Sequence, residues 1–268
     1  MIEKITVNTL VDNGLYDKRL KSEFGYSLLI EYGKEKILFD TGYSNLFLQN
    51  AKKMAIDLNT INSVVVSHRH KSRSGGLPHL VRILKNKTDF LIEPRYFDKF
   101  SKKLGNKIAP GFIDHIDILK TYLENHNMII INKREYKYKD GIYFFLPYDS
   151  QEGRYPLNKY NIRNALVMLM ETQVGIFLFL GAAHSRFSMV LDWFAERFPE
   201  KEIETVFGGI NINFKRQRDV EIVKNSMKKV KINNFQLSHC SSIKEYEFLK
   251  EITHNVYFNG SGKILKYS

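Results

Sequence analysis

Ser63-Val-Val-Val-Ser-His-Arg-His-Lys-Ser-Arg-Ser-Gly-Gly-Leu77 is the stretch of sequence that decides the fold. Its β-branched run Val64–Val66, bounded by polar residues, predicts a short buried strand. His68 and His70 follow at once, with spacing i, i+2, and a helical pattern begins at Leu77 after two glycines. A strand that ends in two imidazoles places both at the edge of a sheet, where functional side chains gather. We therefore expect a functional site in this loop.

The rest of the chain predicts a globular protein. Its 268 residues are 43% hydrophobic and suit one α/β domain, which we expect to span residues 1–268. No apolar run approaches the roughly 20 residues of a membrane span, and the N-terminus lacks the apolar stretch of a signal peptide. The single cysteine, Cys240, excludes an intrachain disulfide framework. These features predict a cytoplasmic protein without membrane contacts.

The charge balance favours an anionic ligand. The formal net charge is +12, from 41 Lys and Arg against 29 Asp and Glu. The lysines are spread along the chain, and no block of basic and aromatic residues stands out. Nucleic acid is therefore the less favoured partner, and an anionic small molecule is preferred. Nothing in the sequence predicts the oligomeric state.

Two strand-rich halves are predicted, and each also contains helices. Gly33-Lys34 is the expected turn of an early hairpin between 26–32 and 36–40, and 147–162 is the longest expected loop. Helices are expected at 46–55, 77–84, 96–104, 110–124, 187–198, 219–230 and to residue 252. The other expected strands are 2–11, 64–66, 90–92, 128–131, 142–146, 165–171, 174–180, 205–207, 235–238, 255–258 and 263–267.

Separate strand ends deliver four histidines. His68 and His70 follow one predicted strand, His184 follows another, and His239 follows a third. Imidazole is a ligand for Zn, Fe, Mn and Cu, and three protein ligands leave a position open for water or substrate. The remaining histidines lie in helical or polar stretches and are interpreted as structural: His79, His115, His126 and His254.

The order of these motifs resembles that of the metallo-β-lactamase superfamily. The matching residues are Asp40-Thr-Gly42, the histidine loop, Gly181-x-x-His-Ser185, Gly208-Gly209 and His239-Cys240. They look most similar to the branch of the dihydropterin-methyl-ribofuranosyl-aminobenzene phosphate synthases and their uncharacterised relatives. The resemblance implies a mixed α/β fold, the four-layer αββα sandwich, in which two sheets pack face to face between helices.

The histidine loop departs from the family pattern. The family has His-x-His-x-Asp-His, but here Ser72 stands at the Asp position and Arg73 at the last His position. The resemblance implies that His68, His70 and His184 hold the first metal. Of the second metal's ligands only His239 is left, as a remnant. Asn211 stands where the branch has a histidine.

Two hypotheses follow from these departures. In the first, the protein is a metal-dependent, hydrolase-like enzyme with at most one ion, zinc in the first place and Mn or Fe as alternatives. Asp40 and Arg73 are then the catalytic-site candidates: Arg73 orients a phosphate or carboxylate, and Asp40 orients the loop. Ser72, Arg73 and Asn211 are the candidates for substrate contacts.

In the second hypothesis the site holds no metal, and the protein is a pseudoenzyme that binds or regulates through a small molecule. The loss of the loop carboxylate and the positive charge of Arg73 both favour it. A nucleophilic Cys240 beside His239 is disfavoured, because adjacent strand residues point to opposite faces. No Gly-x-Ser-x-Gly motif predicts a serine hydrolase.

Overall fold

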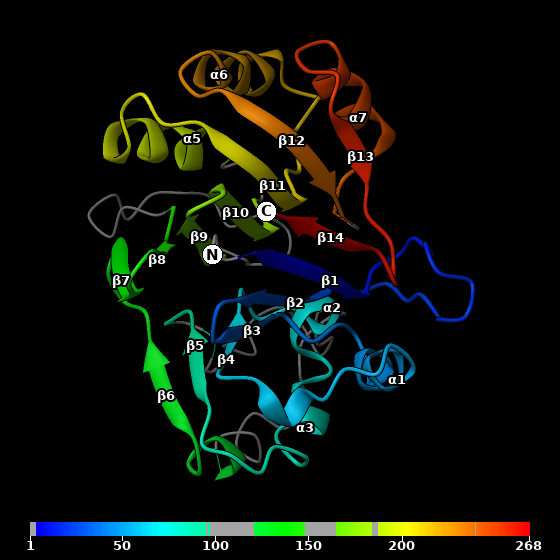
Figure 1. The fold of residues 1–268 in the computed structure, drawn as a ribbon. Coiled ribbons are helices and arrows are strands. Elements are labelled where there is room, and N and C mark those ends of the chain that lie inside the picture. The colour runs from blue at the N-terminus through cyan, green and yellow to red at the C-terminus, as the bar shows by residue number, and fades with distance from the viewer. Residues whose placement is uncertain (1–3, 95, 97–120, 148–164, 184–186, 239) are drawn as a thin grey trace, which may run out of the picture.

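In a computed structural model, strands β1 to β14 form two mixed sheets (Figure 1). The structure describes residues 4–94, 96, 121–147, 165–183, 187–238 and 240–268. Two predicted helices, 96–104 and 110–124, lie wholly or mostly outside the described residues. So do the predicted loop 147–162, His184 and His239.

The first sheet has seven strands within this part of the chain. Strands β14, β1, β2 and β3 are antiparallel neighbours, whereas β3, β4, β5 and β6 run parallel. Their order and bounds are β14 (Ile264–Tyr267), β1 (Ile5–Val11), β2 (Ser27–Tyr32), β3 (Glu35–Phe39), β4 (Ser63–Val66), β5 (Asp89–Ile92) and β6 (Asn127–Ile130).

The second sheet also has seven described strands. Strands β13, β12, β11 and β10 run parallel, and β10, β9, β8 and β7 are antiparallel. Their order and bounds are β13 (Val256–Phe258), β12 (Ile232–Leu237), β11 (Ile203–Gly209), β10 (Gly175–Ala182), β9 (Val167–Thr172), β8 (Ile142–Phe145) and β7 (Glu135–Lys139).

Helices cover the outer face of each sheet, so the molecule has four layers (Figure 1). Helices α1 (Leu46–Lys53), α2 (Lys71–Ser74) and α3 (Leu77–Leu80) lie on the side of the first sheet. Helices α5 (Phe187–Arg197), α6 (Gln217–Met227) and α7 (Ile243–Lys250) lie on the side of the second. Three buried apolar clusters fill the spaces: one between the sheets and one under each helical layer.

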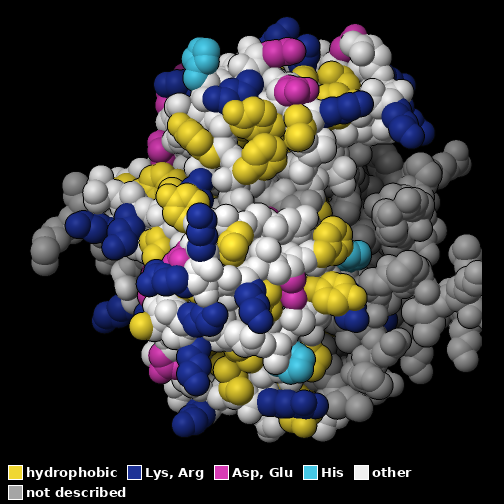
Figure 2. Space-filling view, turned by 90° about the vertical axis from the view of Figure 1, so that its right-hand side faces the viewer, with side chains coloured by type: hydrophobic (Ala, Val, Ile, Leu, Met, Phe, Trp, Pro, Cys, Tyr) yellow, Lys and Arg dark blue, Asp and Glu magenta, His cyan; other side chains and the backbone are white. Residues whose placement is uncertain are grey.

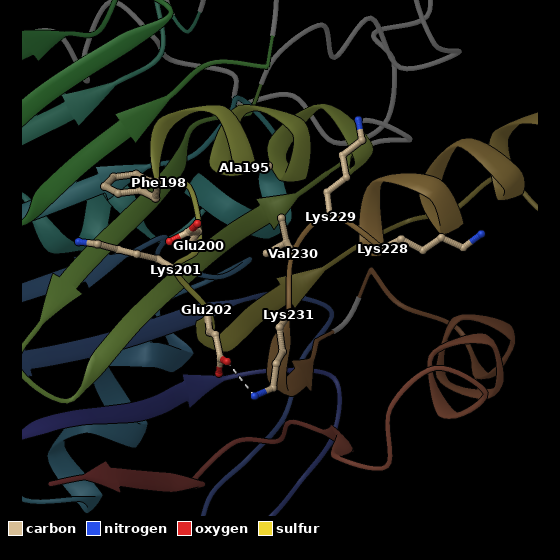
Figure 3. A pocket seen from close by; sticks show the side chains of 9 residues that line it. All are labelled: Ala195, Phe198, Glu200, Lys201, Glu202, Lys228, Lys229, Val230 and Lys231. Carbon is tan, nitrogen blue, oxygen red and sulfur yellow. Dashed lines mark hydrogen bonds and ion pairs between the residues drawn. The ribbon is translucent and has the colours of Figure 1, made fainter.

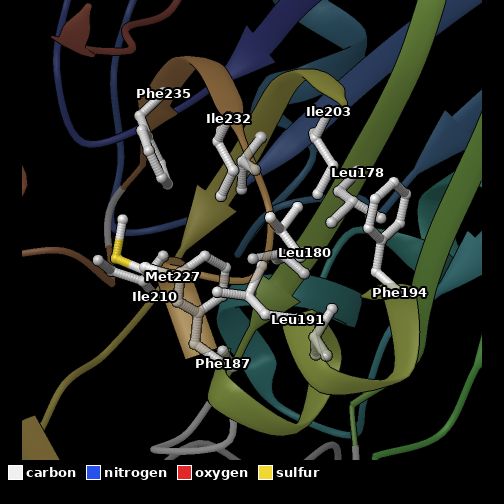
Figure 4. Close-up of a cluster of buried hydrophobic side chains, with 14 of the residues drawn as sticks. Leu178, Leu180, Phe187, Leu191, Phe194, Ile203, Ile210, Met227, Ile232 and Phe235 are labelled. Carbon is white, nitrogen blue, oxygen red and sulfur yellow. The ribbon is translucent and has the colours of Figure 1, made fainter. Parts of the chain in front are cut away.

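Strand β10 shows why the sequence folds into these layers. Its residues Phe177 and Phe179 point into the cluster between the sheets, while Leu178 and Leu180 point into the cluster under α5 to α7. Figure 4 shows the latter two packed with Phe187, Leu191 and Phe194 of α5 and with Ile203, Ile232 and Phe235 of the neighbouring strands. A strand buried on both faces is apolar throughout rather than alternating, and each such side chain stabilises the fold by about 1.5–3 kcal/mol.

The expected αββα sandwich is confirmed, and so is the hairpin of β2 and β3. The sequence did not predict β7, because Glu135–Lys139 carries alternating charged and tyrosine residues rather than an apolar run. It also did not predict the single turn of α2. The two closing strands β13 and β14 lie in different sheets. This is because β14 pairs with β1, far away in the sequence.

Candidate functional site

The candidate site lies at one edge of the sandwich, where strands of both sheets end. Asp40 follows β3 and His68 follows the parallel neighbour β4, so both reach the same edge. In the second sheet β10 passes so close that a Cβ added to Gly181 would lie 2.1 Å from Oγ of Ser67. Glycine is therefore required there, and it brings the two sheets together beside His68.

Ser67 connects Asp40 to His68. The Ser67 N–H donates to Oδ1 of Asp40 (2.8 Å) and its hydroxyl donates to Oδ2 (2.7 Å). The same hydroxyl lies 3.1 Å from Nδ1 of His68, which is only 2% exposed. With that hydroxyl proton given to Asp40, the Ser67 oxygen can accept from Nδ1–H, and in this tautomer the lone pair of the His68 ring is on Nε2. Nε2 is the atom that could bind a metal.

Asp40 is strained and fully buried. Its φ is +59°, in the left-handed region, and its exposed fraction is 0%. Burial raises the pKa of Asp40 to about 7, although Arg73 and the two hydrogen bonds from Ser67 act in the opposite direction. Its carboxylate thus fixes the backbone and the side chain of the residue that precedes His68.

His70 is oriented by Ser72. It is the N-cap of α2, and its Nδ1 accepts from the Ser72 N–H (3.3 Å) and lies 2.6 Å from the Ser72 hydroxyl. Burial, together with the charge of Arg73, lowers the pKa of His70, which favours the neutral ring. A ring that accepts at Nδ1 carries its proton on Nε2. His70 can therefore bind an ion through Nε2 only in the other tautomer, in which Nδ1–H is donated to the Ser72 hydroxyl. The His68 and His70 rings lie with their centroids 6.1 Å apart.

Arg73 points into the protein. The side chain is 0% exposed, Nη1 lies 3.9 Å from Oδ2 of Asp40, and Nη2 donates to Sγ of Cys240 (3.0 Å). The guanidinium carbon lies 4.7 Å from the ring centroid of the buried Tyr26. Nε and Nη1 have no hydrogen-bond acceptor among the described residues. Arg73 therefore joins the histidine loop of the first sheet to the loop after β12 of the second.

The structure thus brings together Asp40, His68, His70, Ser72 and Arg73. Asn211 follows β11 at the same edge of the sandwich, half-buried and with φ +48°. His184 and His239 lie outside the described residues, so the histidine set is described only for its first two members. Ser72 is almost fully buried against His70.

Sequence reasoning missed three residues of the site: Ser67, Tyr26 and Cys240 as a partner of Arg73. Ser67 precedes His68 at a strand end, and that position could have suggested a role. Tyr26 and Cys240 carry no such signal, because they reach Arg73 only through the pairing of distant strands.

The donor set fits part of a one-ion site. Among the described residues no group of three or more His, Cys, Asp or Glu could hold a metal ion. His68 and His70 supply two imidazoles, and the resemblance assigns the third to His184. The guanidinium of Arg73 already places a cation between Asp40 and Cys240.

A groove of about 300 Å³ lies at the opposite end of the second sheet, before β11 and β12 (Figure 3). Four lysines line it, and three of them pair with carboxylates: Lys231 with Glu202 (2.8 Å), Lys229 with Asp192 (2.8 Å), and Lys201 with Glu171. Its positive charge is thus largely compensated. The groove lacks the histidines of the candidate site and is separate from it.

One face of the molecule exposes hydrophobic side chains among basic ones (Figure 2). Lys and Arg are more frequent on this face than Asp and Glu, consistent with the net charge. The exposed aromatic side chains of the described residues include Tyr16, Phe24 and Tyr43, and the ammonium of Lys71 lies 4.4 Å from the Tyr43 ring centroid. No described helix is long and apolar enough to cross a membrane.

Comparison with known proteins agrees with this architecture. The family model described as the Metallo-beta-lactamase superfamily matches residues 21–89. The 7,8-dihydropterin-6-methyl-4-(beta-D-ribofuranosyl)-aminobenzene-5'-phosphate synthase of Methanocaldococcus jannaschii is 23% identical, over 99% of this chain and 98% of its own. An uncharacterized protein of the same organism is 24% identical, over 97% and 99%.

Among solved structures, a metal-dependent hydrolase of the beta-lactamase superfamily matches with a TM-score of 0.76 and 20% identity. The match covers 97% of this chain and 98% of that one. At this identity the structural likeness establishes the fold.

Proposed function

Since this chain has the fold of the metallo-β-lactamase superfamily, we propose that it is a metal-dependent, hydrolase-like enzyme that acts on an anionic small molecule through a single metal ion. The observation that carries the proposal is the buried Arg73, whose guanidinium supplies a permanent positive charge beside Asp40. His68, His70 and His184 would hold the ion. Zinc is the first candidate, with Mn or Fe as alternatives.

The chain's own residues prepare two imidazoles for this task. The bond from Ser67 to Asp40 favours the His68 tautomer whose lone pair is on Nε2, and Ser72 orients the His70 ring through Nδ1. A zinc ion held by three histidines would supply a Lewis acid and lower the pKa of a coordinated water to about 7. Asp40 orients this loop through Ser67 and does not itself have to bind metal.

Arg73 acts in this proposal through its charge rather than through an exposed contact. The guanidinium is buried, and a charge in such surroundings interacts with an anion 4 Å away by about 4 kcal/mol at an effective dielectric of 20. On this proposal the charge of Arg73 favours a phosphate or carboxylate beside His68 and His70. Ser72 and Asn211 remain the candidates for polar contacts with it.

A phosphorylated substrate is the class we propose first. The archaeal relative is named as a synthase of a 5'-phosphate compound, and that name supports a phosphorylated small molecule at 23% identity. Because the name describes a synthase, the reaction class is open to test, and hydrolysis of phosphoesters is the first assay. The positive net charge of the chain favours the same ligands.

Elemental analysis tests the metal. Protein purified without chelator or affinity tag is expected to hold about one equivalent, and the Ser72→Asp, Arg73→His double variant about two. His184→Ala should lose the metal, whereas His79→Ala, a control on an exposed histidine, should retain it. Wild type without metal, together with a double variant that binds it, would contradict the one-ion enzyme.

That last result would favour a second candidate function, a metal-free binding or regulatory protein. The buried pairing of Arg73 with Asp40 and Cys240 supports this candidate. The fixed positive charge of the guanidinium would repel a metal cation bound close to it. In that case His184→Ala should leave ligand binding and stability nearly unchanged.

A further inference from the structure

We propose that Glu245 is a positioning residue that couples the loop after β11 to the loop after β12, both of which border the candidate site. The first of these loops carries Asn211 and the second carries Cys240. The proposal depends on the proposed function in one respect: it assumes that these two loops form one wall of the site. The contacts that support it are independent of any metal.

Both oxygens of Glu245 are used. The residue is 3% exposed, and Oε2 accepts from the N–H of Ser242 (2.5 Å) and from its hydroxyl. These bonds form a capping box at the start of α7. Oε1 accepts from the N–H of Ile212 (3.0 Å), which lies 33 residues away in the sequence. A helix cap needs only the first set of bonds, so the bond to Ile212 joins a second loop to the same carboxylate.

The loop after β11 needs such an anchor. Gly208, near the end of β11, has φ +122°, and Asn211, in the loop that follows, has φ +48°, so the backbone takes a positive φ on both sides of the strand end. Asn211 is one of the residues that adopt this conformation most readily, but it still costs free energy that neighbouring contacts must offset. The bond from Ile212 to Glu245 follows directly after Asn211 and fixes the direction in which its side chain leaves the loop.

The end of β11 also contacts the loop after β12. A Cβ added to Gly209, the last residue of β11, would lie 2.4 Å from Cβ of Cys240, so the strand end packs against this side chain. Sγ of Cys240 in turn accepts from Arg73. Loss of the Glu245 bonds should therefore loosen Asn211 on one side and the contact between Cys240 and Arg73 on the other.

Cys240 is the single cysteine and reports on this wall without any knowledge of the substrate. The experiment measures the rate at which a thiol reagent modifies the metal-depleted full chain. Glu245→Gln keeps one acceptor but turns an amide N–H toward a backbone donor, so one of the two anchored N–H groups loses its acceptor. We expect modification to be about tenfold faster than in wild type or more. Glu245→Ala should be faster still.

Two controls separate local loosening from general loss of stability. Glu247→Gln changes an exposed carboxylate on the same helix and should modify at the wild-type rate. Val223→Ala creates a cavity under α6, lowers global stability in urea and should leave the rate unchanged. The proposal is overturned if Glu245→Gln modifies at the wild-type rate. It is equally overturned if the rates of Glu245→Gln and Val223→Ala rise in proportion to their loss of global stability.

The outcome is also distinct from failure of the proposed function. Glu245→Gln should retain the metal content of wild type, because none of the proposed metal ligands bonds to Glu245 among the described contacts. Suppose that the wild-type protein binds no metal and that Glu245→Gln still speeds up the modification of Cys240. This result would support the positioning role of Glu245 and contradict the proposal of a metal-dependent enzyme.

Discussion

Nη1 of Arg73 lies 3.9 Å from Oδ2 of Asp40, and both side chains are shielded completely from solvent. The separation is too long for a hydrogen bond, and Asp40 gives its hydrogen-bonding capacity to Ser67 instead. The pair is thus an electrostatic contact between a carboxylate that orients the histidine loop and a cation that belongs to that loop. Removing either partner leaves a buried charge uncompensated.

Replacement of Arg73 should destabilise the protein strongly. Arg73→Met leaves Asp40 without its cation, and breaking a buried pair in this way costs about 3–5 kcal/mol. The measurement is urea unfolding at pH 8. Arg197→Met is the control, because Arg197 pairs with Glu135 at the surface (3.0 Å) and should cost about 1 kcal/mol or less. If the two variants lose the same free energy of unfolding, the buried pair contributes no more to stability than the surface pair does.

Stability should depend on pH through Asp40. Its pKa is about 7 in the folded protein and 3.8 as the reference. Between these values the native state binds more protons than the unfolded state, so this group lowers the free energy of unfolding as pH rises from about 4 to 7. Each pKa unit corresponds to about 1.4 kcal/mol. Above pH 7 both states are ionised, and the contribution is constant.

The difference between wild type and Asp40→Asn isolates this effect from that of other titrating groups. Unfolding curves at pH 5, 6, 7 and 8 should show the wild type losing stability relative to the variant up to about pH 7. A difference that does not change with pH would mean that Asp40 is ionised throughout this range.

Ser67 should control metal affinity. Ser67→Ala removes the hydroxyl that joins Asp40 to His68, so the His68 ring loses its fixed tautomer and orientation. Outer hydrogen bonds of this kind affect metal affinity by about 10- to 100-fold. Competition with a chelator measures the change. Ser63→Ala, at the other end of β4, is the matched control and should bind as wild type does. If Ser67→Ala binds the metal as tightly as wild type does, the Ser67 hydroxyl does not control metal affinity.

Gly181 should tolerate no side chain. In Gly181→Ala the new Cβ would lie 2.1 Å from the Ser67 Oγ, so Ser67 or strand β10 must move. Overpacking of this kind costs about 1–3 kcal/mol, and displacement of Ser67 should also weaken metal binding. Thermal unfolding and chelator competition measure the two effects. Wild-type values in both would show that the sheets adjust at this point without cost.

Much of the fold could be predicted from local patterns. Strands β4 and β10 could be predicted from their apolar runs, because a strand that is buried on both faces requires such a sequence. The hairpin could be predicted from the turn around Gly33. Strand β7 could not be predicted from an apolar pattern, since it is the edge strand of its sheet and consists of tyrosines and charged residues. It is a strand because it pairs with β8.

The sequence by itself determined the αββα class, the strand ends that carry His68 and His70, and the replacement of two expected ligands by Ser72 and Arg73. These follow from residue type and order along the chain. Only the tertiary structure decided where Arg73 points, that Ser67 links Asp40 to His68, and that Glu245 joins two loops. Each of these depends on residues that are distant in sequence and that meet because strand pairing and sheet packing place them at one edge.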